Sequence, residues 1–395
     1  MKILSINSGS SSLKFKMYEM PEEKVLIYGY MEKIGGDSSY KIITDRVMEY
    51  HKKLKTHGDA VKVLIDALFE NNIIKDLSEV KGIGHRIVNG AGHYMPELIT
   101  DEVIERLESI SDLSKVHMKG HIAGIKAFRE LGTDIPGYVL YDTAFHHTMP
   151  EENYLFPVPY EWYEKYGVRR FGFHGISCKY ITKEMEKEFG RKVNIIICHI
   201  GNGASVTAVK DSQSIYNSMG FTANAGLIMG TRSGDIDYSL LPYVSKKTGL
   251  DLDEIDHILN YKSGLEGFVE GASDNRDLVK AIKEGNHKAK VISEMCENKV
   301  VDYIARYYVM LDDIDAIIFT AGVGENAINF RRNVLLKLHK LGITVNKEIN
   351  KKITKFSEIS RGIISGEDST IPCYVIPTDE EVMIARDTYE IIEKK

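Results

Sequence analysis

Residues 7–14 read Asn-Ser-Gly-Ser-Ser-Ser-Leu-Lys, and their types and spacing suit the binding of an anion. The apolar run at 2–6 and the alternating run at 13–18 predict a strand on each side of this loop. Gly9 and the three serines that follow it offer backbone N–H groups and hydroxyls to a phosphate, and Lys14 adds a positive charge. A Walker-type phosphate loop would instead lead into a helix. We therefore predict an anion-binding hairpin, with an ordinary turn rich in glycine and serine as the alternative.

The same arrangement recurs near the middle of the chain. The apolar run at 193–200 is followed by the loop Gly201–Ser205 and by a second apolar run at 206–209, so that Gly9 and Gly203 occupy matching places. One phosphate-binding hairpin in each half suggests a duplicated core, with a nucleotide in a cleft between two domains. By analogy, we predict the α/β fold of the actin, hexokinase and Hsp70-like ATPases.

The composition is that of a globular protein of 395 residues, with 43% apolar and 27% charged residues. The net charge of −6 gives no general affinity for nucleic acid or for an anionic membrane. No apolar run approaches the roughly 20 residues of a membrane-spanning helix. The four cysteines are scattered and fit no zinc or redox spacing. We therefore expect a cytoplasmic enzyme with reduced cysteines and no nucleic-acid or membrane partner.

Helical and strand-like segments alternate along the chain, which is typical of an α/β protein. Helices are predicted at 60–70, 102–110, 178–188, 251–261, 277–308 with a break near Gly285, 333–341 and 381–394, and short strands at 137–140 and 315–319. Pro150, Pro157 and Pro159 interrupt regular structure, which favours a domain boundary near them. The expected domains are 1–150, with the helix at about 381–395 packed back on it, and 151–380.

A second glycine-rich segment at 319–326 follows a predicted strand, and residues 322–327 match the pattern GxGxxA. A dinucleotide-binding domain is the alternative that this pattern leaves open. The two hairpins already account for phosphate binding, however, so we expect a nucleoside pocket here. Glycines would let the backbone lie against a base or a ribose.

Polar side chains that suit phosphoryl transfer lie among glycines or directly after strands: Arg86, Asp142, His174 and Arg232. Each of them alone could form a surface ion pair or cap a loop. Their occurrence together with two phosphate loops favours phosphoryl transfer, in which arginines stabilise charge that spreads over the phosphoryl oxygens.

An ordered series of motifs resembles the acetate kinase family, the short-chain carboxylate kinases, over nearly the whole chain. The motifs are residues 7–14, 142–146 (DTAFH), 171–175 (FGFHG), 199–205 (HIGNGAS), 218–222 (SMGFT), 226–237 (GLIMGTRSGDID), 319–326 (FTAGVGEN) and 377–381 (PTDEE). The resemblance implies reversible, ATP-dependent phosphorylation of a short-chain carboxylate, above all acetate, to an acyl phosphate and ADP by direct in-line transfer. It also implies a homodimer through the C-terminal domain, which would bind the nucleotide as well.

The resemblance also assigns roles by position. The implied catalytic residues are Asp142, Arg86, His174, Arg232 and His117. The implied substrate-binding residues are Arg86, Val88, Val116, Phe173 and Ala223. The implied nucleotide-binding residues are Ser10, Ser12, Lys14, His199, Ile200, Gly201, Asn202, Gly203, Asp274, Asn275, Arg276, Gly322, Val323, Gly324, Glu325 and Asn326. Asn7 and Glu380 would lie near Mg²⁺, with Mn²⁺ as an alternative. Because a carboxylate acceptor is already ionised at pH 7, Asp142 is expected to orient the arginines rather than to act as a strong base.

Four segments depart from the family's usual pattern, at 89–91, 115–119, 175–178 and 223–225. Val116 and Ala223 stand where the pattern has larger residues, so we expect a roomier acyl pocket. One methylene in such a pocket is worth about 1–3 kcal/mol of discrimination, which leaves propionate, or a larger or polar carboxylate, as an alternative substrate. A kinase with a hydroxyl acceptor and a non-catalytic nucleotide-binding homologue are the other classes left open.

Overall fold

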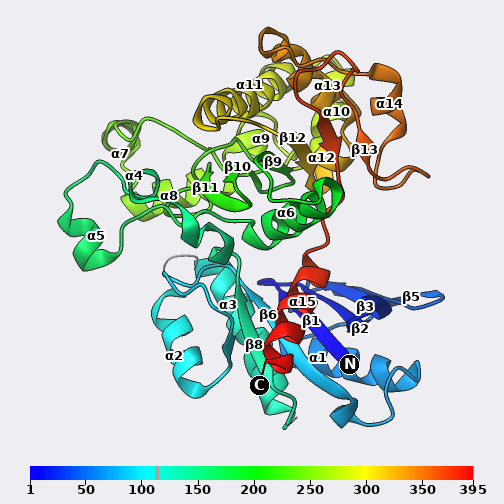
Figure 1. The fold of residues 1–395 in the computed structure, drawn as a ribbon. Helices are drawn as coiled ribbons and strands as arrows, with labels where there is room; N and C mark the ends of the chain where they lie inside the picture. Colours follow the sequence, from blue (N-terminus) through cyan, green and yellow to red (C-terminus); the bar gives the residue numbers. More distant parts are fainter. Residues whose placement is uncertain (112–114, 133, 395) are drawn as a thin grey trace. The chain divides into compact units, whose positions relative to one another are not determined.

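The computed structural model describes residues 1–111, 115–132 and 134–394, with only the backbone of 115–117, and the described residues form two compact units (Figure 1). Unit 1 comprises Met1–His147 and the C-terminal stretch from Asp379, and unit 2 comprises Thr148–Thr378. Among the described residues, no helix is both long enough and apolar enough to cross a lipid bilayer.

A mixed sheet forms the centre of unit 1, in the order β5-β4-β3-β2-β1-β6-β8-β7. Its strands are β1 (Lys2–Ser8), β2 (Leu13–Glu19), β3 (Lys24–Glu32), β4 (Ser39–Ile43), β5 (Val47–His51), β6 (Val80–Ile87), β7 (Glu97–Leu98) and β8 (Gly137–Tyr141). β1 pairs antiparallel with β2 in the hairpin predicted around Gly9, while β1, β6 and β8 run parallel. Because parallel strands end at one edge of a sheet, the residues at the ends of β1, β6 and β8 are brought together.

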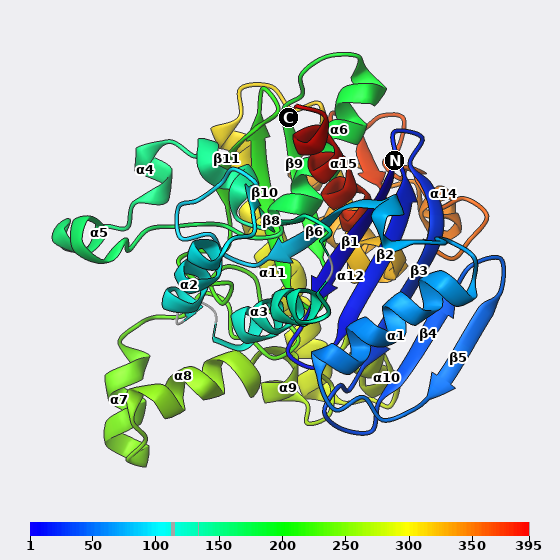
Figure 2. The ribbon, with the colours of Figure 1, turned by 90° about the horizontal axis from the view of Figure 1, so that it is seen from below.

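Helices pack on both faces of this sheet. They are α1 (His57–Glu70), α2 (Asp101–Ser109), α3 (Lys115–Glu130) and α15 (Glu380–Glu393). Leu4 of β1 shares a core with α1, which lies along β3 and β4 in Figure 2. Ser5 points to the opposite face, where its hydroxyl donates to the carbonyl of Glu381 in α15. On β6, a Cβ at Gly84 would collide with Ile384, so glycine lets α15 pack directly on the strand.

The sheet of unit 2 has the order β11-β10-β9-β12-β14-β13. Its strands are β9 (Ile195–Ile200), β10 (Ala204–Lys210), β11 (Gln213–Asn217), β12 (Ala316–Thr320), β13 (Gly362–Ile363) and β14 (Cys373–Val375). The helices of unit 2 are α4 (Glu151–Tyr154), α5 (Glu161–Tyr166), α6 (Gly175–Phe189), α7 (Leu240–Thr248), α8 (Leu252–Tyr261), α9 (Gly264–Phe268), α10 (Asn275–Lys283), α11 (His287–Met310), α12 (Ala321–Asn326), α13 (Ile328–Lys337) and α14 (Lys347–Lys352).

The two sheets share one pattern of pairing. The order β11-β10-β9-β12-β14 repeats the order β3-β2-β1-β6-β8, with antiparallel pairing along the first three strands and parallel pairing afterwards. The predicted duplicated core, and with it the predicted α/β fold class, is therefore confirmed.

The second glycine-rich segment differs from its prediction. Residues 321–326, expected as a loop, form the short helix α12, and the next helix begins at Ile328, before the predicted start at 333. Two buried charged side chains provide the reason. Glu325 accepts a hydrogen bond from the backbone N–H of Ala321 (2.9 Å), which has a left-handed φ of 64°, and Arg331 donates to a carbonyl of α12 (2.9 Å). These contacts satisfy polar backbone groups that would otherwise be buried without partners.

Candidate functional site

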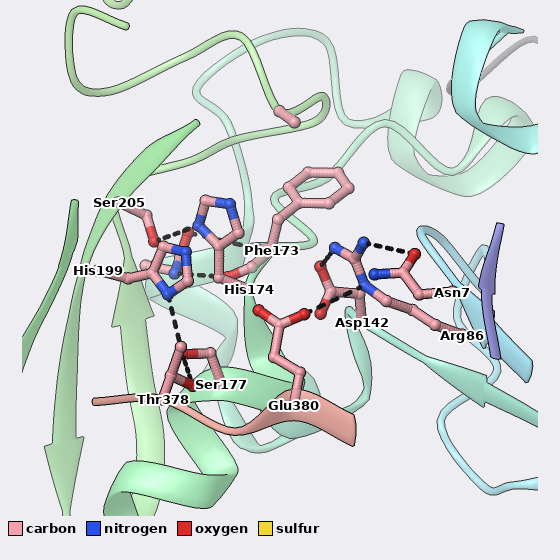
Figure 3. Close-up of polar contacts among 12 residues, drawn as sticks. Asn7, Arg86, Asp142, Phe173, His174, Ser177, His199, Ser205, Thr378 and Glu380 are labelled. Atoms are coloured by element: carbon pink, nitrogen blue, oxygen red, sulfur yellow. Dashed lines mark hydrogen bonds and ion pairs between the residues drawn. The ribbon is translucent and has the colours of Figure 1, made fainter. Parts of the chain in front are cut away.

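In unit 1, the ends of three strands and the first turn of α15 bring four predicted site residues together (Figure 3). Arg86 lies near the end of β6, and Asp142 directly follows the parallel strand β8. Nη2 of Arg86 donates to Oδ2 of Asp142 (2.8 Å), and Nη1 donates to Oδ1 of Asn7 at the end of β1 (3.4 Å). Nε of Arg86 lies 3.9 Å from Oε2 of Glu380, in the first turn of α15. The arginine is thus held between two carboxylates and an amide.

The charges of this cluster are unevenly matched. Burial is the largest effect on Glu380 and raises its pKa to about 7; the attraction of Arg86 lowers the pKa by less than burial raises it, and Asp142 and Glu381 raise it further. Burial alone would lower the pKa of Arg86, but the attraction of Asp142 and Glu380 outweighs it, and the arginine pKa is raised. Two carboxylates around one arginine therefore leave an excess of negative charge, which a proton or a bound cation would neutralise.

This cluster fits a magnesium ion that is held mainly by waters and by the phosphates of a bound nucleotide, with few protein ligands. Among the described residues, no group of three or more histidine, cysteine or acidic side chains is arranged to hold a metal. Mg²⁺ commonly keeps several waters and binds one or two carboxylates together with substrate phosphates. The oxygen atoms of Asn7 and Glu380, in the electronegative surroundings just described, are ligands of the right kind.

The β1–β2 hairpin carries Ser10 and Ser12 in its loop and Lys14 at the start of β2. The loop is a tight turn, because the N–H of Gly9 donates to the carbonyl of Ser12 (2.8 Å). Nε2 of His57 lies 2.8 Å from the Gly9 carbonyl and fixes the turn from outside. Ser10 and Lys14 are exposed, so their polar groups are open to solvent and to a ligand.

In unit 2, two predicted histidines form a stacked pair (Figure 3). The rings of His174 and His199 lie 4.0 Å apart with an interplanar angle of 18°. Nδ1 of His174 contacts Oγ of Ser205 (3.0 Å), and Nδ1 of His199 contacts Oγ of Ser177 (2.8 Å), which in turn contacts Oγ1 of Thr378 (2.8 Å). Each ring is therefore oriented by a hydroxyl group at its Nδ1 atom.

Arg232 lies in the same unit, close to the second hairpin loop. Its Nη1 donates to the carbonyl of Ala223 (3.1 Å), and burial lowers its pKa. A Cβ at Gly203 would lie 3.3 Å from Nε2 of His174 and 3.7 Å from Nη1 of Arg232. The structure thus brings the second hairpin loop together with His174 and Arg232, as a phosphate site requires.

The predicted acyl-pocket residues are divided between the units. Val88 of unit 1 and Phe173 of unit 2 are buried, and Ala223 of unit 2 is half-buried. The side chains of Val116 and His117 lie outside the described part of the structure, and their backbone lies in the first turn of α3. The acyl pocket therefore stays a prediction.

Most of the residues predicted to bind the nucleoside line a cavity of 420 Å³ in unit 2. The predicted residues that line it are Ile200, Gly201, Asn202, Asp274, Asn275, Arg276, Gly322, Val323 and Asn326. His199, Gly203, Gly324 and Glu325 of the same unit do not line it, and Ser10, Ser12 and Lys14 belong to unit 1. Its volume and its mostly apolar wall are those of a small-molecule site.

The cavity wall includes residues that the motifs do not reveal. The face of α11 contributes Ser293, Cys296 and Val300, whose spacing is helical, while Phe330 and Phe356 come from α13 and a later loop. Burial raises the pKa of the Cys296 thiol to about 12. Helical spacing could have suggested the α11 residues, although the same spacing is found on any helix that faces a core.

The two sheets, which share one strand order and each carry a hairpin at the matching place, have the duplicated α/β topology predicted for the actin and hexokinase type of fold. The sequence pattern of the acetokinase family matches residues 2–386, and the chain belongs to this family. The predicted family is thereby confirmed.

Named relatives agree over the full length. The acetate kinase of Bacillus subtilis (strain 168) is 46% identical over 396 residues, which cover 99% of each chain. Among solved structures, a propionate kinase from Francisella tularensis subsp. tularensis SCHU S4 superposes with a TM-score of 0.92 at 34% identity, covering 98% of this chain and 99% of that one. The acetate kinase of Porphyromonas gingivalis superposes with a TM-score of 0.89 at 36% identity, covering 99% of each chain.

Proposed function

We propose that the protein catalyses the reversible, ATP-dependent phosphorylation of acetate to acetyl phosphate and ADP. A carboxylate oxygen of acetate forms a bond to the γ-phosphorus while the bond to the β–γ bridging oxygen breaks, so that ADP leaves in line. The observation that carries this proposal is the cluster of Arg86, Asp142 and Glu380 in a chain of the acetokinase family.

The chemistry joins two anions, and the proposed roles follow from that requirement. Arg86 and Arg232 bind the carboxylate and the transferring phosphoryl group, and His174 donates to the phosphoryl oxygens as their charge grows. Asp142 orients Arg86 through the 2.8 Å contact and needs to accept no proton, since acetate is already ionised. The protein therefore acts by positioning and by electrostatic stabilisation, without a covalent intermediate.

Mg²⁺ is part of the proposal, with Asn7 and Glu380 as its protein ligands and Mn²⁺ as an alternative. When bound, the ion would neutralise charge on the nucleotide phosphates. The electronegative surroundings of Glu380 support this assignment, because they favour a cation next to the carboxylate.

Separate residues are proposed to bind the nucleoside and the phosphates of the nucleotide. The nucleoside occupies the cavity of unit 2. The proposed phosphate-binding residues are His199, Gly203, Ser10, Ser12 and Lys14. We propose residues 1–150 with 381–395, and 151–380, as the two functional domains.

A dimer is proposed from exposed apolar side chains on the segment 236–252 of unit 2. These side chains are Ile236, Tyr238, Leu240, Tyr243 and Leu252, and Tyr238 is 81% exposed. Such a patch is typical of a contact surface, and the resemblance to the family points to a second copy of this chain. Light scattering should give twice the chain mass, and Tyr238→Asp together with Tyr243→Asp should give a monomer. A cytoplasmic location is proposed because the reaction consumes ATP and the four cysteines are reduced.

The deciding experiment is an assay of the purified protein with ATP and Mg²⁺ in which hydroxylamine traps acyl phosphate as the hydroxamate. Acetate should give the highest kcat/KM. Propionate is the second candidate, because the Francisella propionate kinase superposes on this chain, and butyrate and hydroxy acids complete the series. A higher kcat/KM with propionate than with acetate would make propionate the preferred substrate. No hydroxamate with any acid would refute the function.

A further inference from the structure

Phe356 occupies an unusual position beside the nucleoside cavity of unit 2. It lies on the loop between α14 and β13 and is 86% exposed, more than any other large apolar side chain in the described part of the chain. It nevertheless contributes to the wall of the 420 Å³ cavity. A phenylalanine that is open to water on the rim of an apolar cavity has one ring face available to a ligand.

Hydrogen bonds and an ion pair hold the loop that carries Phe356 against α12, which lines the cavity. The backbone N–H of Lys355 donates to Oδ1 of Asn326 (3.1 Å), and Nδ2 of Asn326 donates to the carbonyl of Gly322 (2.8 Å). Nζ of Lys355 also lies 3.7 Å from Oε2 of Glu325. These contacts keep Phe356 next to Gly322, where the open space around the missing Cβ leaves room for a ligand.

The apolar wall of the cavity can pack against one face of a planar base. Its apolar residues include Leu227, Ile228, Leu265, Leu278, Val323 and Phe330. A base that lies against such a wall still exposes its second face to water. Stacking of an aromatic side chain on that face is sequence-tolerant, because every base has a π-face.

We propose that Phe356 stacks on the base of the bound nucleotide and closes the open side of the cavity. The proposal rests on the proposed function, since it takes the cavity as the nucleoside site. A purine presents a larger face than a pyrimidine, so Phe356 contributes to the preference for purine nucleotides without distinguishing adenine from guanine.

Kinetics of Phe356→Ala, Phe356→Leu and Phe356→Tyr test this role. In Phe356→Ala, the KM for ATP should rise about tenfold, in line with the value of base–aromatic stacking, while kcat and the KM for acetate stay within about twofold. Phe356→Tyr should restore the ATP KM, and Phe356→Leu should not. The advantage of ATP over CTP and UTP should shrink in the alanine variant.

Two controls separate stacking from a general loss of structure. Tyr166→Ala removes another exposed aromatic, 71% exposed on α5 and away from the cavity, and should leave every constant unchanged. Inorganic tripolyphosphate has no base, so its inhibition constant should be the same for wild type and Phe356→Ala. An equal loss of tripolyphosphate binding would overturn the stacking role.

A fluorescence experiment gives a readout that is independent of activity. Trp162 is the only tryptophan, so Trp162→Phe combined with Phe356→Trp places a single fluorophore on the rim. ADP should quench this fluorophore, and tripolyphosphate should not. An ATP KM within twofold of wild type in Phe356→Ala, or no quenching by ADP, would refute the proposal. An absence of hydroxamate in wild type combined with intact quenching would refute the proposed reaction alone.

Discussion

Arg86 and Arg232 are expected to serve the same anions, yet the two units hold them in opposite ways. Arg86 lies between Asp142 and Glu380, and their attraction raises its pKa. The contacts described for Arg232 are to the carbonyl of Ala223 and the sulfur of Met229, and burial lowers its pKa. Attraction to carboxylates therefore outweighs the burial cost of the charge on Arg86, whereas the burial cost dominates at Arg232, where an incoming anion would offset part of it.

This difference predicts two distinct outcomes when the arginines are removed. Both Arg232→Ala and Arg86→Ala should lower kcat by about 10³-fold or more, the effect of losing an arginine that stabilises a phosphoryl transition state. Arg86→Ala should also lower the midpoint of thermal unfolding, because Asp142 and Glu380 are left facing each other. Arg232→Ala should leave the midpoint unchanged or higher. The hydroxamate assay and differential scanning calorimetry measure the two quantities.

The lysine variants serve as the matched control for this pair. Lysine keeps the charge but lacks the planar fork, so Arg232→Lys should recover little activity, while Arg86→Lys should recover the unfolding midpoint. Near wild-type turnover in either alanine variant would contradict the assigned role. Equal loss of stability in both would contradict the comparison of the two arginines.

Asp142→Asn tests whether the carboxylate orients Arg86 or accepts a proton. A positioning role predicts a fall in kcat of about 10²-fold, the typical cost of misplacing a catalytic group, with little change in the shape of the pH profile. If Asp142 were instead a general base, the acidic limb of the profile would disappear in Asp142→Asn. Asp37→Asn changes an exposed aspartate away from the assigned residues and is the control.

Glu380 makes stability itself depend on pH. Its pKa is about 7 in the folded chain against 4.5 ordinarily, so the folded state binds the proton more tightly than the unfolded state. Linkage then requires that the stabilisation from this proton is present at low pH and is lost as pH rises through that window. Without metal, the unfolding midpoint of wild type should fall from pH 5 to pH 8 relative to Glu380→Gln. Parallel curves would show that Glu380 ionises normally, and Mg²⁺ should stabilise wild type most at the upper end.

The features that the sequence predicts well are local. The apolar and alternating runs that flank Gly9 and Gly203 predicted both hairpins. The resemblance to the family predicted that Asp142 would orient the arginines, and Asp142 does contact Arg86. Glu325 shows where this stops. It stands in a glycine-rich motif, and no sequence signal tells a carboxylate that faces a ligand from one that, as here, accepts backbone hydrogen bonds in the interior. Contacts between distant segments, such as α11 and the cavity, depend on packing that periodicity does not encode.

The smallest effect is expected where unit 2 relies on neutral hydrogen bonds rather than ion pairs. Thr378→Val breaks the contact to Ser177 and loosens His199, but it keeps the backbone N–H that Glu325 accepts (3.0 Å). A neutral hydrogen bond is worth about 0.5–1.5 kcal/mol, so kcat should fall only a few-fold, with the acetate KM unchanged. Thr378→Ser keeps the hydroxyl and should restore activity. Thr378→Val should add nothing to Ser177→Ala, because Thr378 acts on His199 only through the hydroxyl of Ser177. Additive losses would mean that the two hydroxyls act separately, and that unit 2 does not orient His199 through them as unit 1 orients Arg86 through Asp142.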